Sequence, residues 1–61
     1  MNICSKRFNI KSDGFGSVGV KDRDAPYHYH TIDLSDMPSI NQIALMTESQ
    51  FDSVISDLIY T

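Results

Sequence analysis

Residues 46–61, Met-Thr-Glu-Ser-Gln-Phe-Asp-Ser-Val-Ile-Ser-Asp-Leu-Ile-Tyr-Thr, contain the pattern that decides the fold of this chain. Apolar side chains recur there at the i, i+3, i+4, i+7 and i+8 spacing of one helix face: Phe51, Val54, Ile55, Leu58 and Ile59. Thr47 and Gln50 have the spacing of a capping box, and Met46 stands at the position of a hydrophobic staple. The stretch therefore predicts an amphipathic helix over 48–59.

The residues before this helix show the two-residue alternation that is typical of strands. Alternation is strictest over 27–34, where one side would carry Tyr27, Tyr29, Thr31 and Asp33 and the other His28, His30, Ile32 and Leu34. We expect further strands over 2–10, 15–21 and 40–46.

Turn-forming residues separate these segments. The Asp13-Gly14 pair predicts a hairpin turn after the first strand, because Asp-Gly readily adopts positive φ angles. Gly16 and Gly19 weaken the second strand and indicate a bulge or a close backbone approach. Residues 21–26 are expected to form a charged connection that Pro26 holds extended.

These elements predict an α+β fold, namely a small three- to four-stranded, largely antiparallel sheet with one C-terminal amphipathic helix packed on one face. The length of 61 residues corresponds to a single small domain, residues 1–61, with a modest core. A lone cysteine, Cys4, excludes an internal disulfide, so self-association, most simply as a homodimer, is expected to supply stability. The single thiol and the lack of a long apolar run favour a cytoplasmic protein that does not contact a membrane.

The charges of the chain are divided between its two halves. All five lysines and arginines lie within residues 1–23, whereas residues 24–61 carry only carboxylates; the net charge is −3. A segment of this kind either pairs with the basic segment inside the fold or offers a negative surface to a cationic partner. Lys6, Arg7 and Lys11 could lie near the tyrosines, but the net charge argues against direct binding of nucleic acid, which depends on cation–phosphate contacts.

His28 and His30 are two residues apart on one strand and could share a metal ion, with Cys4 as a third ligand. Zinc prefers three or four ligands, usually with tight local spacing, and this set lacks that spacing. We therefore predict no metal and no cofactor. Cys4, placed on the side of Phe8 and Ile10, is expected to be a buried thiol without a catalytic role, and no enzymatic activity is predicted.

Protein recognition is the function that these features favour. We expect a non-enzymatic interaction module that binds a basic protein surface, as phage or mobile-element inhibitors of nucleic-acid-handling enzymes do. Its contact residues would be the tyrosines of the third strand and carboxylates of the acidic half: Tyr27, Tyr29, Asp33, Asp36, Asp52 and Asp57. Two alternatives stay open, a small metal-binding or accessory subunit that uses His28, His30 and Cys4, and a homo-oligomeric or antitoxin-like regulator.

Overall fold

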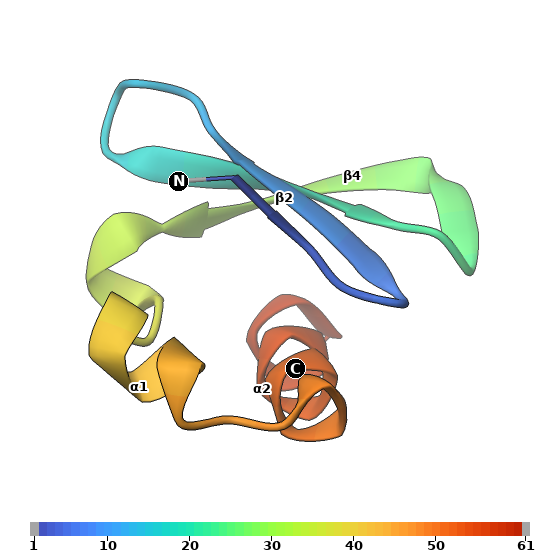
Figure 1. Ribbon diagram of the computed structural model, residues 1–61. Coiled ribbons are helices and arrows are strands. Elements are labelled where there is room, and N and C mark those ends of the chain that lie inside the picture. Colours follow the sequence, from blue (N-terminus) through green and yellow to red (C-terminus); the bar gives the residue numbers. More distant parts are fainter. Residues whose placement is uncertain (1, 61) are drawn as a thin grey trace.

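The computed structural model describes residues 2–60, which form two layers: an antiparallel sheet and, beneath it, a helical layer (Figure 1). The predicted α+β fold is confirmed. Neighbouring strands pair in chain order, and the elements are β1 (Asn2–Cys4), β2 (Phe8–Ser12), β3 (Ser17–Asp22), β4 (Ala25–Asp33), a 3₁₀ turn η1 (Leu34–Asp36), α1 (Ile40–Ala44) and α2 (Glu48–Tyr60). Among residues 2–60, no helix is long and apolar enough to cross a membrane.

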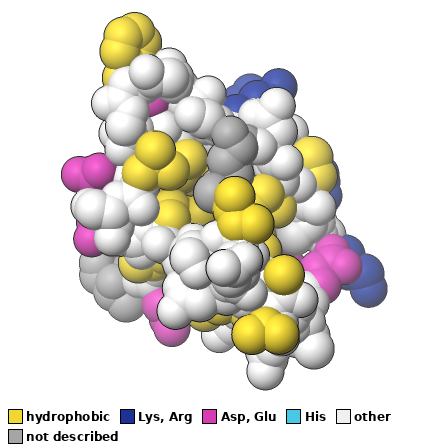
Figure 2. Space-filling model, turned by 60° about the vertical axis from the view of Figure 1, so that its left-hand side comes forward, with side chains coloured by type: hydrophobic (Ala, Val, Ile, Leu, Met, Phe, Trp, Pro, Cys, Tyr) yellow, Lys and Arg dark blue, Asp and Glu magenta, His cyan; other side chains and the backbone are white. Residues whose placement is uncertain are grey.

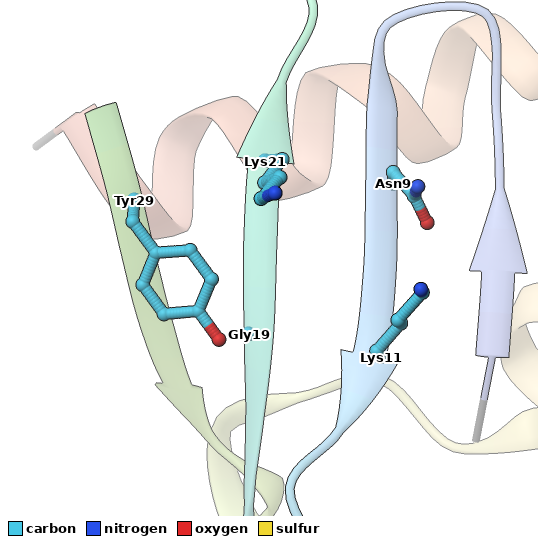
Figure 3. Close-up of a pocket in the computed structure, with 5 residues that line it drawn as sticks. All are labelled: Asn9, Lys11, Gly19, Lys21 and Tyr29. Carbon is cyan, nitrogen blue, oxygen red and sulfur yellow. The ribbon is translucent and has the colours of Figure 1, made fainter. Parts of the chain in front are cut away.

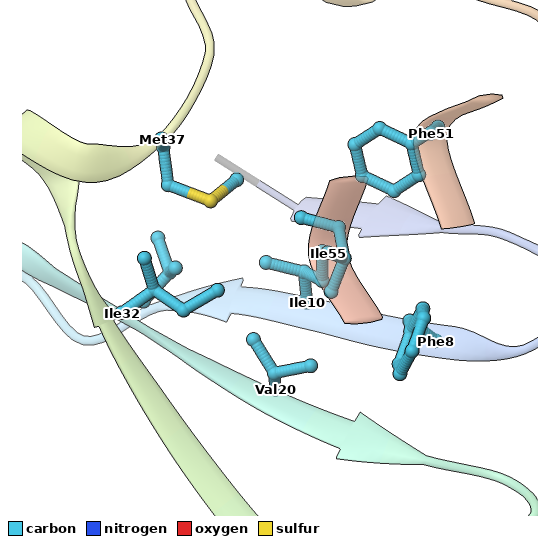
Figure 4. Close-up of a cluster of buried hydrophobic side chains, with 8 residues drawn as sticks. Phe8, Ile10, Val20, Ile32, Met37, Phe51 and Ile55 are labelled. Carbon is cyan, nitrogen blue, oxygen red and sulfur yellow. The ribbon is translucent and has the colours of Figure 1, made fainter. Parts of the chain in front are cut away.

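The hydrophobic core lies between the sheet and α2 (Figure 4). Its side chains are at most 9% exposed and come from three strands, the segment after η1, and α2: Phe8, Ile10, Val18, Val20, Ile32, Met37, Phe51 and Ile55. The buried Phe51 and Ile55 confirm the apolar face predicted for the helix. Leu58, one turn further on, is 38% exposed, so the apolar stripe extends beyond the core.

The start of α2 follows the predicted capping box. Thr47 Oγ1 accepts a hydrogen bond from the Gln50 amide at 3.1 Å, and Gln50 Oε1 accepts one from the Thr47 amide at 2.9 Å. The hairpin turn between β2 and β3 is confirmed as well, with positive φ angles at Gly14 and Gly16. Asp13 Oδ1 closes this turn by accepting from the Phe15 amide at 2.7 Å.

The first predicted strand is interrupted, which reverses the side on which Cys4 lies. Ser5 turns the chain by accepting the Phe8 amide on its Oγ at 2.9 Å, so that residues 2–10 become β1 and the start of β2. Cys4 then pairs with Asn9, on the face of the sheet opposite to Phe8. The prediction of a buried Cys4 is therefore wrong, and the thiol is exposed.

The predicted fourth strand over 40–46 is also wrong, because this segment begins as helix α1. Ser39 and Gln42 form a second capping box, with Gln42 N donating to Ser39 Oγ at 3.2 Å and Ser39 N donating to Gln42 Oε1 at 2.8 Å. These bonds stabilise the first helical turn and divert the alternating apolar residues from a strand.

The charged connection over 21–26 is shorter than predicted. Only Arg23 and Asp24 form the turn, since β3 continues to Asp22 and β4 begins at Ala25. Pro26 is tolerated within β4 because this is an edge strand. At the other end of β4, Leu34 enters η1 and is 41% exposed, whereas Ile32, predicted on the same side of the strand, is buried.

Candidate functional site

Charge divides between the layers of the molecule. We call residues 34–60, with η1, α1 and α2, the helical layer; it carries Asp36, Glu48, Asp52 and Asp57 and no lysine or arginine. All the basic side chains belong to the strands and turns of the sheet. The division seen along the sequence thus becomes a division between two sides of a folded protein.

A buried carboxylate, Asp22, joins these layers. Its oxygens accept hydrogen bonds from Arg7 Nε at 3.2 Å and Nη2 at 3.1 Å, from Tyr60 Oη at 2.5 Å and from the Asp24 amide at 2.9 Å. The hydrogen bonds from Arg7 are the main reason that the pKa of Asp22 falls to about 2. Because its own chain satisfies this carboxylate, Asp22 holds α2 against the sheet and is not available for acid–base chemistry.

The first turn of α2 is docked on the β1–β2 turn by two further carboxylates. Ser5 Oγ donates to Asp52 Oδ1 at 2.5 Å, and the Lys6 amide donates to Glu48 Oε1 at 2.5 Å. Part of the acidic half therefore bonds with the basic segment inside the fold. Asp36 and Asp57 are exposed on the helical layer.

The side of the sheet away from the helices is uncovered, and we call it the open face. It presents Asn9, Lys11, Gly19, Lys21 and Tyr29, which line a shallow hollow of about 90 Å³ (Figure 3). The Tyr29 hydroxyl lies against Gly19, where an added Cβ would come within 1.8 Å of Oη. The predicted close approach of backbone at Gly19 is wrong in its partner, because the atoms nearest to Gly19 belong to the Tyr29 side chain.

The six predicted contact residues do not form one surface. Tyr27 and Tyr29 are 96% and 63% exposed on β4, and Asp33 ends the same strand. Three carboxylates lie on the helical layer instead: Asp36 on η1, and Asp52 and Asp57 on α2. A flat partner surface could not contact the tyrosines and the carboxylates of α2 together.

The proposed metal ligands are separated as well. The His30 ring meets the Tyr60 ring edge-on, with centroids 5.2 Å apart, so His30 faces the helical layer. Cys4 lies on the open face at the opposite edge of the sheet, with its Sγ 3.5 Å from Asn9 Oδ1. Across residues 2–60, no three His, Cys, Asp or Glu side chains are placed to hold a metal ion. Cys4 and the two histidines are therefore not one site.

The sequence patterns missed an apolar surface on the helical layer. Ile40 and Leu45, assigned above to a strand, are 70% and 88% exposed. Met46, which follows Leu45 in the chain, lines a hollow together with Gln50, Ser53 and Val54. Figure 2 views the molecule from the side of α1 and shows exposed apolar clusters with acidic side chains at several points of their margin, and Lys or Arg side chains at the upper and right-hand edges of the view. The capping box at Ser39 was the signal that could have revealed this surface.

Comparison of the chain with protein-family models, with curated proteins and with solved structures finds no match. Its function is therefore inferred from its own geometry and charge.

Proposed function

We propose that this protein is a non-enzymatic interaction module that binds a basic surface of a partner protein through its helical layer. The observation that carries the proposal is the combination of exposed Ile40 and Leu45 with carboxylates and without any basic side chain on that layer. Apolar side chains at the centre of an interface supply most of its affinity, and a charged margin supplies orientation and association rate.

The acidic margin selects the chemistry of the partner. Asp36 and Asp57 are exposed there, and a cationic surface would gain their long-range attraction during encounter. Nucleic-acid-handling enzymes present such surfaces, so an inhibitor or adaptor of an enzyme of this class, such as those of phages and mobile elements, fits best. The free, exposed Cys4 thiol fits a reducing compartment, and we place this function in the cytoplasm.

The tyrosines are excluded from this interface by position and by charge. Tyr29 lines the same hollow of the open face as Lys11 and Lys21, which would repel a cationic surface. The proposed interface therefore keeps Asp36 and Asp57, adds Ile40 and Leu45, and omits Tyr29.

The test compares two exposed positions on opposite sides of the molecule. A partner protein is first captured with the tagged protein. Surface plasmon resonance then measures its binding to the parent, to Leu45→Asp and to Tyr29→Ala. Leu45 is 88% exposed, so its replacement leaves the core intact, and we expect binding at least tenfold weaker through faster dissociation. Tyr29→Ala is expected to bind like the parent. The reverse pattern would move the interface to the open face.

A second candidate, a homo-oligomeric regulator, is favoured by the outer edge of β4. This strand is nine residues long and, within residues 2–60, has a partner strand only on the β3 side. Antiparallel pairing of two copies about Tyr29 would set Asp33 opposite Ala25 and would bring no like charges together. Light scattering tests this pairing: a dimer mass that Tyr29→Lys reduces to the monomer supports it, and a monomer mass at high micromolar concentration excludes it.

A further inference from the structure

We propose that the open face binds single-stranded nucleic acid, with the Tyr29 ring as a stacking platform for a base and with Lys11 and Lys21 neutralising phosphates. This site lies on the opposite side of the sheet from the proposed protein interface and does not depend on it. A module with both surfaces could hold a nucleic-acid-handling protein and a nucleic acid strand at once.

The first observation that supports this proposal is the position of the Tyr29 ring on the sheet. Gly19 has no positive φ, so its backbone conformation does not require glycine, but any Cβ there would collide with the Tyr29 hydroxyl. The glycine thus lets the phenol ring lie along the sheet. Figure 3 looks onto the open face and shows this ring face-on, and the residue is 63% exposed. One side of the ring covers the strand and the other is available for stacking.

The second support is the pair of lysines beside the ring. Lys11 is paired with Gly19 on β3, and Lys21 is paired with Tyr29 on β4, so the two lysines lie diagonally on adjacent strands. Within residues 2–60 neither lysine makes an ion pair with a carboxylate. Two unpaired ammonium groups at diagonal positions of adjacent strands repel each other, and a bound polyanion relieves this repulsion.

Folding removes the objection that net charge raises against nucleic acid. Of the eight acidic side chains, Asp22 and Asp24 interact with Arg7 in the β-sheet layer, while Glu48 and Asp52 are bonded at the start of α2. The exposed Asp33 at the end of β4 offsets part of the lysine charge, and the potential over the open face is set by these local side chains more than by the total charge of −3.

A nucleic acid strand fits this face better than an acidic protein segment does. Carboxylates could use the two lysines but would leave the exposed side of the Tyr29 ring without a partner, whereas bases stack on tyrosine regardless of sequence. The hollow of about 90 Å³ is too shallow to enclose a free nucleotide, which favours a strand lying across it.

Fluorescence anisotropy with a labelled oligothymidylate tests the proposal over a range of salt concentrations. Two phosphate contacts predict that the logarithm of the binding constant falls with the logarithm of salt concentration with a slope of about −1.4. Lys11→Ala and Lys21→Ala should each reduce this slope by about 0.7. Tyr29→Ala should weaken binding about tenfold without changing the slope, and Tyr29→Phe should restore it.

Gly19→Ala tests whether the position of the Tyr29 ring, and not only its presence, matters for binding. The variant keeps both lysines and Tyr29 but displaces the ring, so we expect it to bind oligothymidylate as weakly as Tyr29→Ala does. Circular dichroism checks that this variant is folded. If it is not folded, the affinities of Tyr29→Ala and Tyr29→Phe decide whether the ring takes part in binding. Leu45→Asp serves as the control and should bind oligothymidylate like the parent.

Three results would overturn the proposal. The first is no binding at low salt, and the second is binding that Tyr29→Ala leaves unchanged. The third is equal affinity for oligothymidylate, duplex DNA and polyglutamate, which would identify the open face as a surface for acidic proteins or for anions in general.

Discussion

Tyr60 Oη donates a 2.5 Å hydrogen bond to Asp22 Oδ2 and so fastens the last turn of α2 to the end of β3. The same oxygen receives Arg7 Nη2 at 3.1 Å. One buried carboxylate therefore ties together the β1–β2 turn, β3 and the C-terminal helix, in a chain whose core contains few side chains.

Asp22→Asn should lower the free energy of unfolding by about 2 kcal/mol, because it removes the charge that pairs with Arg7 in a buried position. Tyr60→Phe should have a smaller effect, since it leaves the pair with Arg7 in place. Urea denaturation followed by circular dichroism measures both. Tyr27→Phe, at a position 96% exposed, is the matched control for the loss of a tyrosine hydroxyl. Equal stability of Asp22→Asn and the parent would show that the hydrogen bonds to Asp22 do not stabilise the fold.

The same carboxylate predicts loss of stability in acid. Its pKa falls from 3.8 to about 2 on folding, so Asp22 binds a proton more weakly in the folded state than in the unfolded state. Its contribution is therefore complete above about pH 4 and is lost as the pH falls toward 2, by about 2 kcal/mol in total. Urea titrations between pH 5 and pH 2 should show this loss in the parent and a smaller one in Asp22→Asn. Parallel curves would contradict this assignment.

Phe51→Asp should abolish the folded state, because Phe51 is 4% exposed and its replacement would bury a carboxylate among apolar side chains. Leu58→Asp, on the same helix but 38% exposed, is the control and should still unfold cooperatively. Thermal melts followed by circular dichroism distinguish the two variants. A cooperative transition for Phe51→Asp within a few degrees of the parent would mean that this face of α2 does not carry the core.

The sequence predicted the elements whose signals are local and repeated. The apolar spacing and capping box at Thr47 located α2, and Asp13-Gly14 located the β2–β3 turn. Cys4 was misplaced because the bond between Ser5 and Phe8 reverses the alternation, and a single turn of this kind leaves little trace in a pattern of period two. The helix at Ser39 was missed because its apolar residues also fit a strand.

The candidate sites were less predictable, since they depend on which strands become neighbours. Tyr27 and Tyr29 were expected to be exposed and are, but the place of Tyr29 beside Lys11 and Lys21 follows from the register of three strands. The carboxylates of α2 were assigned to the same surface as the tyrosines because the sequence does not show which layer each occupies.

Binding of the protein partner should depend on salt through its association rate. Long-range attraction to Asp36 is screened beyond about 8–10 Å at physiological ionic strength, so added salt should slow association more than it speeds dissociation. Asp36→Asn should lower the association rate. Thr31→Lys changes the net charge by the same amount but lies on the sheet, paired with Gly19, and should have less effect. Surface plasmon resonance at two salt concentrations measures both variants; if Thr31→Lys slowed association as much as Asp36→Asn, total charge rather than the helical layer would guide the encounter.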